Sequence, residues 1–586
     1  MKQSAPPAFE IGLVMAGAAS AGAYTAGVVD YLIEALQAWE NAKVAGDLRV
    51  PDHVVRLRVA AGASAGGIVG ALLSMLPFTG HFPVTDLADA SAATDVANGE
   101  RNLLYRSWVL RTDVSQLLTT DDLRGRPPKV WSLLNGRVLT EIAEEAVASV
   151  RAAMPAPAVP PSYFANPLQL YLSLTNMRGI SYVIRMIADE RMRGHAVRSH
   201  CDYAHFALLG TGAGPAEPLP PGAIPVNRPD AADGWDAVRD AALATSAFPC
   251  GFPVRPFHNP KHVYRERVFG GQATAASGKV SVAVDMDLPQ DDGDSCLLWC
   301  VDGGLLNNEP LEYAHWALLN GTSRPPSTDG RRADRSLLLV DPFPNDTGRP
   351  GGTRSDQAPD VLDSLFALIP MLRSHAAFKP QELAVAFDEE IRNRYLITPV
   401  RETALPQQTE LASAGLAGFA GFLHEQLRMH DFQLGRRNCQ KFLRDHFHLH
   451  VDNPLVRNWV QRMRAEGGIP SQYHPGQLDP NGCRELRTDL VQIIPQVDAV
   501  RRDVMLRPWP KLDREQDFEP IRRLILRRAD STVPELMRAL LTRAGVGDRR
   551  LVNRALRAIA CDMITSRVGQ SAADAIERDL TMRGLL

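Results

Sequence analysis

The sequence has little of several features that mark particular classes of protein. Its seven cysteines are odd in number, widely scattered and never spaced as C-x-x-C, which favours a reducing compartment over a disulfide framework or a zinc site. No stretch approaches the ~20 uninterrupted apolar residues that a membrane-spanning helix needs. The first residues lack the basic region and bounded apolar run of a secretory signal. We therefore expect a cytoplasmic protein whose contact with membranes is at most peripheral.

An excess of charge of one sign is also absent. The formal net charge of -3 over 586 residues gives no electrostatic case for nucleic acid, so we predict no such partner. The composition, with 45% hydrophobic and 22% charged residues, is typical of globular proteins. The chain exceeds the ~250 to 300 residues at which a single core stops growing, which indicates one large unit with additional packed segments.

Two successive strand-loop-helix units open the chain. The first predicts a strand at Ile11–Ala16, a loop at Gly17–Gly22 and a helix from about Ala23. The second predicts a strand at Val54–Ala60, a tight turn, and a buried helix at Ile68–Leu76. Units of this kind indicate an α/β layered sheet.

Further apolar runs predict strands at Leu168–Leu174, Cys296–Val301 and Ser336–Val340. Proline, glycine and aspartate punctuate residues 77–134 and 210–235, which indicates long insertions over the edge of the sheet, one of them a candidate lid.

Beyond a turn-rich link after residue 341, most segments are typical of helices. Examples are Phe419–His430 and Pro534–Ala544, the latter with Pro534 in its first turn and Gly545 just after its end.

The strongest motif is the G-x-S-x-G run Gly62–Gly66, which lies between a predicted strand and a predicted helix. Small residues on both sides of Ser64 allow a sharp turn that projects the hydroxyl at the N-terminus of the helix. The pattern predicts a nucleophile elbow. The structural alternative is a glycine and serine turn that merely packs the helix closely on its strand.

A second motif, D-G-G, begins with Asp302 at the end of a predicted strand and continues through Gly303 and Gly304. An aspartate there lies where α/β sheets build their sites, and the glycines allow another loop to approach closely. Taken alone, D-G-G is more often a simple turn.

A third feature is the small-residue loop Gly17–Gly22 between the first strand and helix. Its backbone N–H groups can receive the negative oxygen of a tetrahedral intermediate, so Gly17, Ala18 and Ala19, together with Ala65 after the serine, are candidate oxyanion or substrate-binding residues. The alternative, a phosphate-binding loop, lacks both G-x-G-x-x-G and a P-loop lysine.

In this order and spacing, the three motifs resemble the patatin-like phospholipase family. Leu174–Asn176 and Ala241–Pro249 resemble further family segments, and His430–Asn438 is similar to a longer bacterial branch with a helical extension. The resemblance covers roughly residues 9–345. It implies a three-layer α/β/α sandwich with a mostly helical C-terminal extension.

The resemblance also implies a lipid acyl hydrolase of the phospholipase A type. Ser64 would be the nucleophile and Asp302 its partner in a catalytic dyad that works through an acyl-enzyme. The backbone turns of the two motifs would be supported by their glycines, which are Gly62, Gly66, Gly303 and Gly304. The substrate would be a membrane phospholipid or other lipid ester, with no cofactor and no metal.

The loop departs from the family pattern, because Ala18 and Ala19 stand where the family has glycine and Ala21 where it has a basic residue. Backbone donors survive a change from glycine to alanine where φ is negative.

Two other functions stay open. The first is a Ser-His-Asp esterase, for which His430 and the histidines of residues 446–450 are the downstream candidates. The second is a catalytically weak lipid-binding or scaffold protein. The basic and apolar segment Ile521–Asp530 fits either an anionic lipid surface or a water-exposed face paired with acids.

We accordingly predict three regions: a patatin-like catalytic core at 1–345, a sheet-completing and helical segment packed on it at 346–450, and a helical extension at 451–586.

Overall fold

The computed structural model describes residues 8–85, 98–125, 129–153, 160–184, 195–210, 217–227, 233–265, 284–287, 293–319, 327–344, 394–401, 410–478, 484–543 and 551–586. Within these residues, no helix is both long and apolar enough to cross a membrane.

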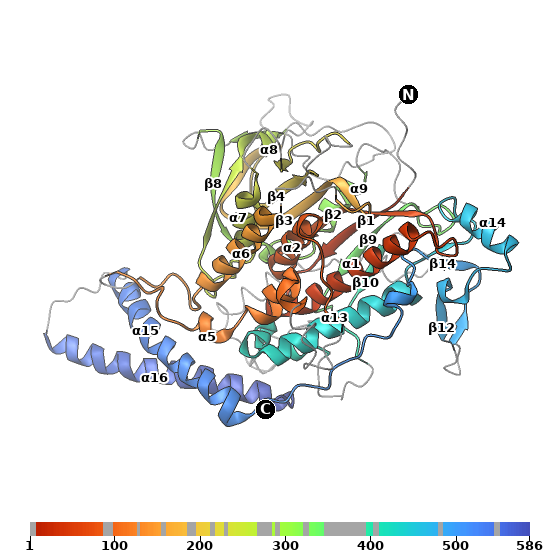
Figure 1. The fold of residues 1–586 in the computed structure, drawn as a ribbon. Coiled ribbons are helices and arrows are strands. Elements are labelled where there is room, and N and C mark those ends of the chain that lie inside the picture. The colour runs from red at the N-terminus through yellow and green to blue at the C-terminus, as the bar shows by residue number, and fades with distance from the viewer. Residues whose placement is uncertain are drawn as a thin grey trace.

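A large sheet forms the centre of the molecule (Figure 1). Its strands run in the order β10-β9-β1-β2-β3-β4-β5, and the first four pair in parallel with one another and with the start of β3. The strands are β1 (Ala8–Met15), β2 (Val54–Gly62), β3 (Phe164–Ile184), β4 (His195–Leu208), β5 (Ile224–Val226), β9 (Arg335–Val340) and β10 (Arg394–Ile397).

The far half of the sheet is mostly antiparallel. The long strand β3 pairs antiparallel with β4, with β7 (Val284–Asp287) and with β8 (Ser295–Val301), and β8 pairs with β6 (Arg255–Pro260). The short helix α8 (Lys261–Arg265) follows β6. The end of β8 is thereby brought beside the middle of β3.

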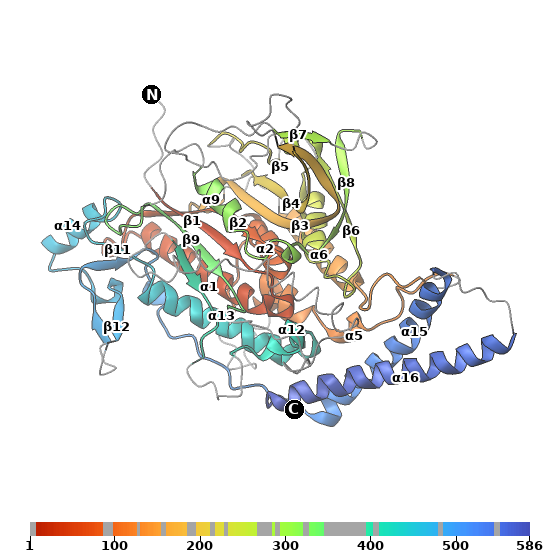
Figure 2. The same ribbon diagram turned by 180° about the vertical axis from the view of Figure 1, so that it is seen from behind.

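Helices cover both faces of the sheet unequally. One face carries α1 (Gly22–Val44), α2 (Ser64–Thr79) and α13 (Glu425–Asp445), whose apolar residues share one core with the strands. On the other face, α9 (Leu311–Leu319) packs on β1, β2 and β9. Helix α7 (Trp235–Thr245) packs against α2 and β3. The result is an α/β/α arrangement (Figure 2).

The insertion after α2 is folded into helices. It contains α4 (Leu103–Tyr105), the π-helix η2 (Arg106–Leu110), α5 (Val114–Leu117) and α6 (Arg137–Ala153). Helix α6 packs on both α2 and α7, so this insertion lies against the helices that flank the sheet.

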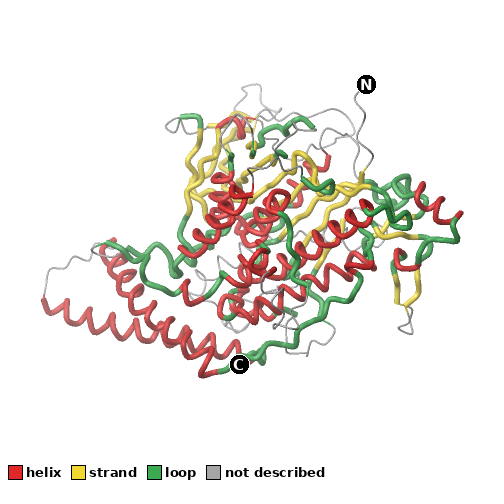
Figure 3. Tube along the Cα trace, viewed as in Figure 1, coloured by secondary structure: helices red, strands yellow, loops and turns green. Residues whose placement is uncertain are grey.

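The C-terminal region is mainly helical, with a few short strands (Figure 3). Helices α15 and α16 extend from the body as a long pair beside α5, while α14 and β12 lie at the opposite end of the molecule (Figures 1 and 2). The elements are α12 (Gly415–Gly418), η5 (Ala420–Leu423), β11 (His448–His450), α14 (Arg457–Ala465), β12 (Gly476–Leu478), β13 (Arg484–Leu486), β14 (Leu490–Gln492), η8 (Arg514–Phe518), α15 (Glu519–Arg543) and α16 (Leu551–Met582).

Two predicted helices have different bounds in the structure. The segment Phe419–His430 is divided at His424, whose extended backbone and side chain cap the N-terminus of α13. Pro534 lies inside α15 rather than in the first turn of a helix. A proline usually ends or begins a helix because it lacks an N–H group, but here the helix continues through it.

The segment Ile521–Asp530 buries three of its side chains, Ile521, Ile525 and Arg528, against the rest of the protein. Ile521 and Ile525 join an apolar cluster with α16, and Arg528 is buried against Asp122. This arrangement is the acid-paired alternative of the two that the sequence left open.

A buried charge cluster joins α1 to α13. Arg436 donates to Asp30 and, at 2.6 Å, to Glu34, and Asn102 Nδ2 donates to Asp30 at 2.5 Å. Burial raises the pKa of Glu34 to about 7 and lowers that of Arg436 to about 9. The family-like segment His430–Asn438 therefore ties α13 to α1.

Candidate active site

Ser64 lies on a sharp turn between β2 and α2. Gly62 is the last residue of β2 and Ser64 the first of α2, and Ser64 has the left-handed φ of 51°. A left-handed conformation is strained for a residue with a Cβ atom. The turn needs Gly66, because a Cβ atom there would lie 2.2 Å from the carbonyl oxygen of Met15. The Ser64 hydroxyl is thereby presented at the N-terminus of the helix.

Asp302 follows the end of β8 and faces Ser64. The Ser64 hydroxyl donates to Asp302 Oδ2 at 2.6 Å, and the Gly304 N–H donates to Oδ1 at 2.8 Å. Asp302 is buried, and Gly303 and Gly304 begin the short η3 helix (Gly303–Leu305). The two residues that the motifs single out are thus in direct contact.

The last residue of α7 and the residues just after it contact both partners. The Ser64 N–H donates to Thr245 Oγ1 at 3.0 Å, and the Asp302 N–H donates to the Ala247 carbonyl at 2.8 Å. Both residues belong to the small-residue run Ala241–Pro249. This run therefore sets the distance between the serine and the carboxylate.

The loop after β1 lies beside this pair. Gly17, Ala19 and Ala65 line the same pocket as Ser64, whereas Ala18 is fully buried. The Gly17 N–H donates to the Asn308 carbonyl at 3.3 Å. The Gly17 N–H is thus bonded within the chain, while Ala19 and Ala65 lie at the pocket beside Ser64.

Ala19 has a left-handed backbone, with φ of 46°. The condition of negative φ, under which alanine replaces glycine without strain, is not met at this position. A left-handed conformation costs a residue with a Cβ atom about 1 to 2 kcal/mol. The next residue, Ser20, is buried and hydrogen bonded to η5 and α12, so the loop is held in this shape from outside.

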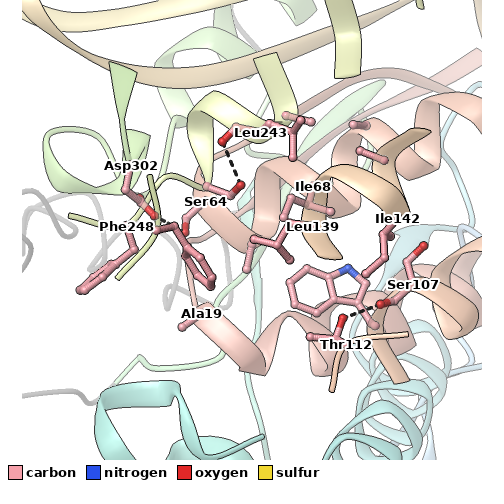
Figure 4. Close-up of a pocket in the computed structure, with 18 of the residues that line it drawn as sticks. Ala19, Ser64, Ile68, Ser107, Thr112, Leu139, Ile142, Leu243, Phe248 and Asp302 are labelled. Atoms are coloured by element: carbon pink, nitrogen blue, oxygen red, sulfur yellow. Dashed lines mark hydrogen bonds between the residues drawn. The ribbon is translucent and has the colours of Figure 1, made fainter. Parts of the chain in front are cut away.

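A largely apolar pocket begins at Ser64 and Asp302. Its cavity has a volume of about 90 Å³. Leucine, isoleucine, alanine and phenylalanine side chains of α2, α6, α7 and the C-terminal region make up most of its wall. Figure 4 places Ser64 and Asp302 at one side, with Ile68, Leu139 and Ile142 between them and the pair Ser107 and Thr112. A mostly apolar space that begins at a serine and a carboxylate suits an acyl chain.

The histidines that the sequence offered as a catalytic base lie elsewhere. His430 is buried in α13 with its Nδ1 2.8 Å from Asp431 Oδ1, and His448 is in the short strand β11. No histidine is among the described residues that line the pocket. Across the described parts of the chain, no cluster of three or more metal-ligating side chains occurs.

Sequence reasoning missed several residues of the site. Asn308 lies between the first loop and the D-G-G motif, since Cβ atoms added at Gly17 and at Gly304 would each lie 2.6 Å from its Oδ1. In the sequence, Asn308 is marked only by its position shortly after the D-G-G motif. Aromatic residues also form part of the pocket wall, and of these only Phe248 lies in a family-like segment: Trp108, Phe248, Phe252, Phe419 and Phe422.

These features define an α/β protein with a serine and an aspartate in contact at the head of an apolar pocket. The model of the patatin-like phospholipase family matches residues 13–315. The chain belongs to the patatin-like phospholipase family. This membership supports a lipid acyl hydrolase in general terms.

A relative supports the same membership over most of the chain. It is an uncharacterized protein, y4iI, of Sinorhizobium fredii, 32% identical over 579 residues, which cover 92% of this chain and 77% of the relative. Among solved structures, the chain is similar to VipD from Legionella pneumophila with a TM-score of 0.17 and 12% identity, over 73% of this chain and 67% of that one. A likeness at this level supports no further argument.

Proposed function

We propose that this protein is a phospholipase A-type acyl hydrolase that cleaves fatty acyl esters with Ser64 as nucleophile and Asp302 as base. The observation that carries the proposal is the 2.6 Å hydrogen bond from the Ser64 hydroxyl to Asp302 Oδ2 at the head of the apolar pocket. Because Gly304 holds Oδ1, the other carboxylate oxygen is directed at the serine.

In the first half of the reaction, Ser64 Oγ attacks the ester carbonyl carbon while Asp302 Oδ2 accepts the hydroxyl proton. The tetrahedral intermediate collapses, the bond to the alcohol breaks, and the alcohol takes the proton from Asp302. In the second half, water attacks the acyl-enzyme and gives its proton to Asp302. Ser64 then regains that proton and the fatty acid leaves.

The amides of Ala18, Ala19 and Ala65 are our candidates for stabilising the oxyanion. Ala65 lies in the first turn of α2, where unpaired N–H groups and the helix dipole favour negative charge. Gly17 contributes to the wall of the pocket. Since Ala21 stands where the family has a basic residue, we assign this task to the backbone donors.

The decisive experiment compares wild type with Ser64→Ala and Asp302→Asn on a short-chain nitrophenyl ester and on phospholipid vesicles. Loss of a general base or a nucleophile typically lowers the rate by about 100-fold or more, and we expect this for both variants and both substrates. Ser74→Ala is the matched control, because Ser74 is a buried serine of the same helix that bonds only its local carbonyl at Ala71.

Two outcomes contradict the proposal. Activity that survives Asp302→Asn but not Ser64→Ala points to a histidine base. A folded wild type that hydrolyses neither ester points to a lipid-binding or scaffold protein.

We further propose that the protein works in the cytoplasm, at the surface of a membrane. The scattered cysteines of the sequence and the apolar pocket support this placement. Fractionation of cells that express the full chain tests it, because a soluble pool that also associates reversibly with membranes is expected.

A further inference from the structure

Two large apolar side chains stand exposed in the segment that precedes α6. Trp131 and Leu133 leave 61% and 48% of their surfaces exposed, while Ser132 between them is buried. Single exposed apolar residues are common on soluble proteins and need no explanation. Trp131 and Leu133 are unusual because they lie near the pocket and because hydrogen bonds fix their backbone.

Their position is the rim of the pocket. The Leu133 N–H donates to the Cys250 carbonyl at 2.8 Å, and the next N–H, of Leu134, donates to Gly251 at 3.0 Å. The residues on either side of this turn, Phe248, Pro249 and Phe252, line the pocket. Phe248 and Pro249 are also partly exposed, and the turn that carries them is bonded to Leu133 and Leu134.

Their backbone is fixed by a buried arginine of α15. Arg528 donates to the carbonyls of Ser132 and Leu133 at 3.1 and 3.0 Å, and it pairs with Asp122 in the same insertion. The carbonyl acceptors and the carboxylate together satisfy its guanidinium. The backbone that exposes Trp131 and Leu133 is therefore held in place by Arg528.

A cation accompanies the exposed indole. The Lys129 ammonium lies 3.8 Å from the centre of the Trp131 ring, and Lys129 is itself exposed. Tryptophan prefers the level of lipid headgroups, and a lysine beside it can extend its ammonium to the phosphates. The rim thus combines an interfacial aromatic, an aliphatic side chain and a cation.

We propose that Lys129, Trp131 and Leu133, here called the docking rim, hold the protein on a phospholipid bilayer with the pocket mouth facing the lipid. The inference rests on the proposed acyl hydrolase function, since a pocket that takes acyl chains must receive them from a bilayer. The continuity of the docking rim with the pocket mouth selects a lipid surface over a protein partner. Trp131 and Leu133 enter the interface, and an acyl chain passes beside Phe248 into the pocket.

The test uses the full chain and vesicles of phosphatidylcholine with a minor share of phosphatidylglycerol. The double variant Trp131→Ala with Leu133→Ala is compared with Leu48→Ala, whose side chain is 66% exposed near α14, at the other end of the molecule. Removing two interfacial side chains is expected to weaken vesicle binding about ten-fold or more, with vesicle hydrolysis lowered alongside it. Hydrolysis of a soluble nitrophenyl ester is expected to stay within about two-fold of wild type, because neither residue lines the pocket.

Lys129→Glu gives a second, independent measurement that leaves the apolar side chains in place. It is expected to weaken binding to the anionic vesicles and to have much less effect on vesicles of phosphatidylcholine alone, since only the former attract a cation strongly. Docking is measured separately from catalysis with Ser64→Ala, which should bind vesicles like wild type.

Unchanged vesicle binding in the double variant and in Lys129→Glu would overturn the proposal. A double variant that changes self-association in sedimentation, with vesicle binding intact, would assign the docking rim to a second copy of the chain and would also overturn it. A wild type that binds vesicles through the docking rim yet hydrolyses no ester would refute the proposed function and leave the docking surface standing.

Discussion

Replacement of Ser20 by alanine tests whether the C-terminal region is part of the active site. Ser20 follows Ala19 in the loop after β1, and its hydroxyl donates to the Gly418 carbonyl at 2.5 Å and accepts from the Gly421 N–H at 2.9 Å. These two contacts, here called the Ser20 bridge, span 398 and 401 positions in the sequence. They hold the loop that carries the proposed oxyanion donors.

The magnitude follows from the groups that Ser20→Ala would strand. Gly418 and Gly421 are buried, and a buried backbone group that loses its partner costs about 1 to 3 kcal/mol, so the two together cost about 2 to 6 kcal/mol. The left-handed backbone of Ala19 stores a further ~1 to 2 kcal/mol that favours relaxation of the loop. Loss of one oxyanion donor typically lowers kcat by about 100- to 1000-fold, so a displaced donor should lower it by at least about ten-fold.

The assay is hydrolysis of short and medium nitrophenyl esters at several concentrations, with urea unfolding measured in parallel. We expect kcat to fall much more than KM rises, because Ser20 is not among the residues of the pocket wall. Ser74→Ala, which removes one local hydrogen bond in α2, should lose stability with little change in kcat. A folded Ser20→Ala variant with the kcat of wild type would refute the reasoning and make the Ser20 bridge purely structural.

Three further substitutions are expected to change the stability of the protein. Arg528→Met should cost about 3 kcal/mol in urea unfolding, because it leaves Asp122 and several backbone carbonyls without their guanidinium partner. Gly66→Ala should abolish soluble expression or shift Tm strongly downward, because its Cβ atom would lie 2.2 Å from the Met15 carbonyl oxygen. Burial raises the pKa of Glu34 from 4.5 to about 7, so the folded state binds a proton that the unfolded state releases between these values. Stability should therefore fall by up to about 3 kcal/mol as pH rises through this window, and Glu34→Gln should remove that slope in urea unfolding at pH 5 and 8.

The elements around Ser64 could be predicted from the sequence because their signals are local. A strand, a turn of small residues and an apolar helix follow one another within a few residues, and the structure has β2, the turn at Gly62 and α2 there. The contact of Ser64 with Asp302 crosses 238 positions. Before the structure, these two residues were brought together by the position of Asp302 at a strand end and by the resemblance to a family.

The shape of the pocket could not be predicted in this way. Phe419 and Phe422 line it from a segment that the sequence indicated as the start of one long helix. In the structure, Leu416 and Ala417 have left-handed φ values of 54° and 55°, which turn the chain before η5. Neither residue type favours that conformation, so tertiary contacts such as the Ser20 bridge decide it.

The C-terminal region contributes to the part of the chain that matches the family model, although the match ends at residue 315. Helix α13 lies well beyond that point, yet its Arg436 neutralises Asp30 and Glu34, which face it from the buried side of α1. Without the C-terminal region, a broad apolar surface of α1 would meet water, and the pocket would lack Phe419 and Phe422. Removal of one partner from a buried ion pair typically costs about 3 to 5 kcal/mol, a large share of the ~5 to 15 kcal/mol that stabilises a domain. The residues that match the family model therefore depend on the C-terminal region both for their stability and for the shape of the site.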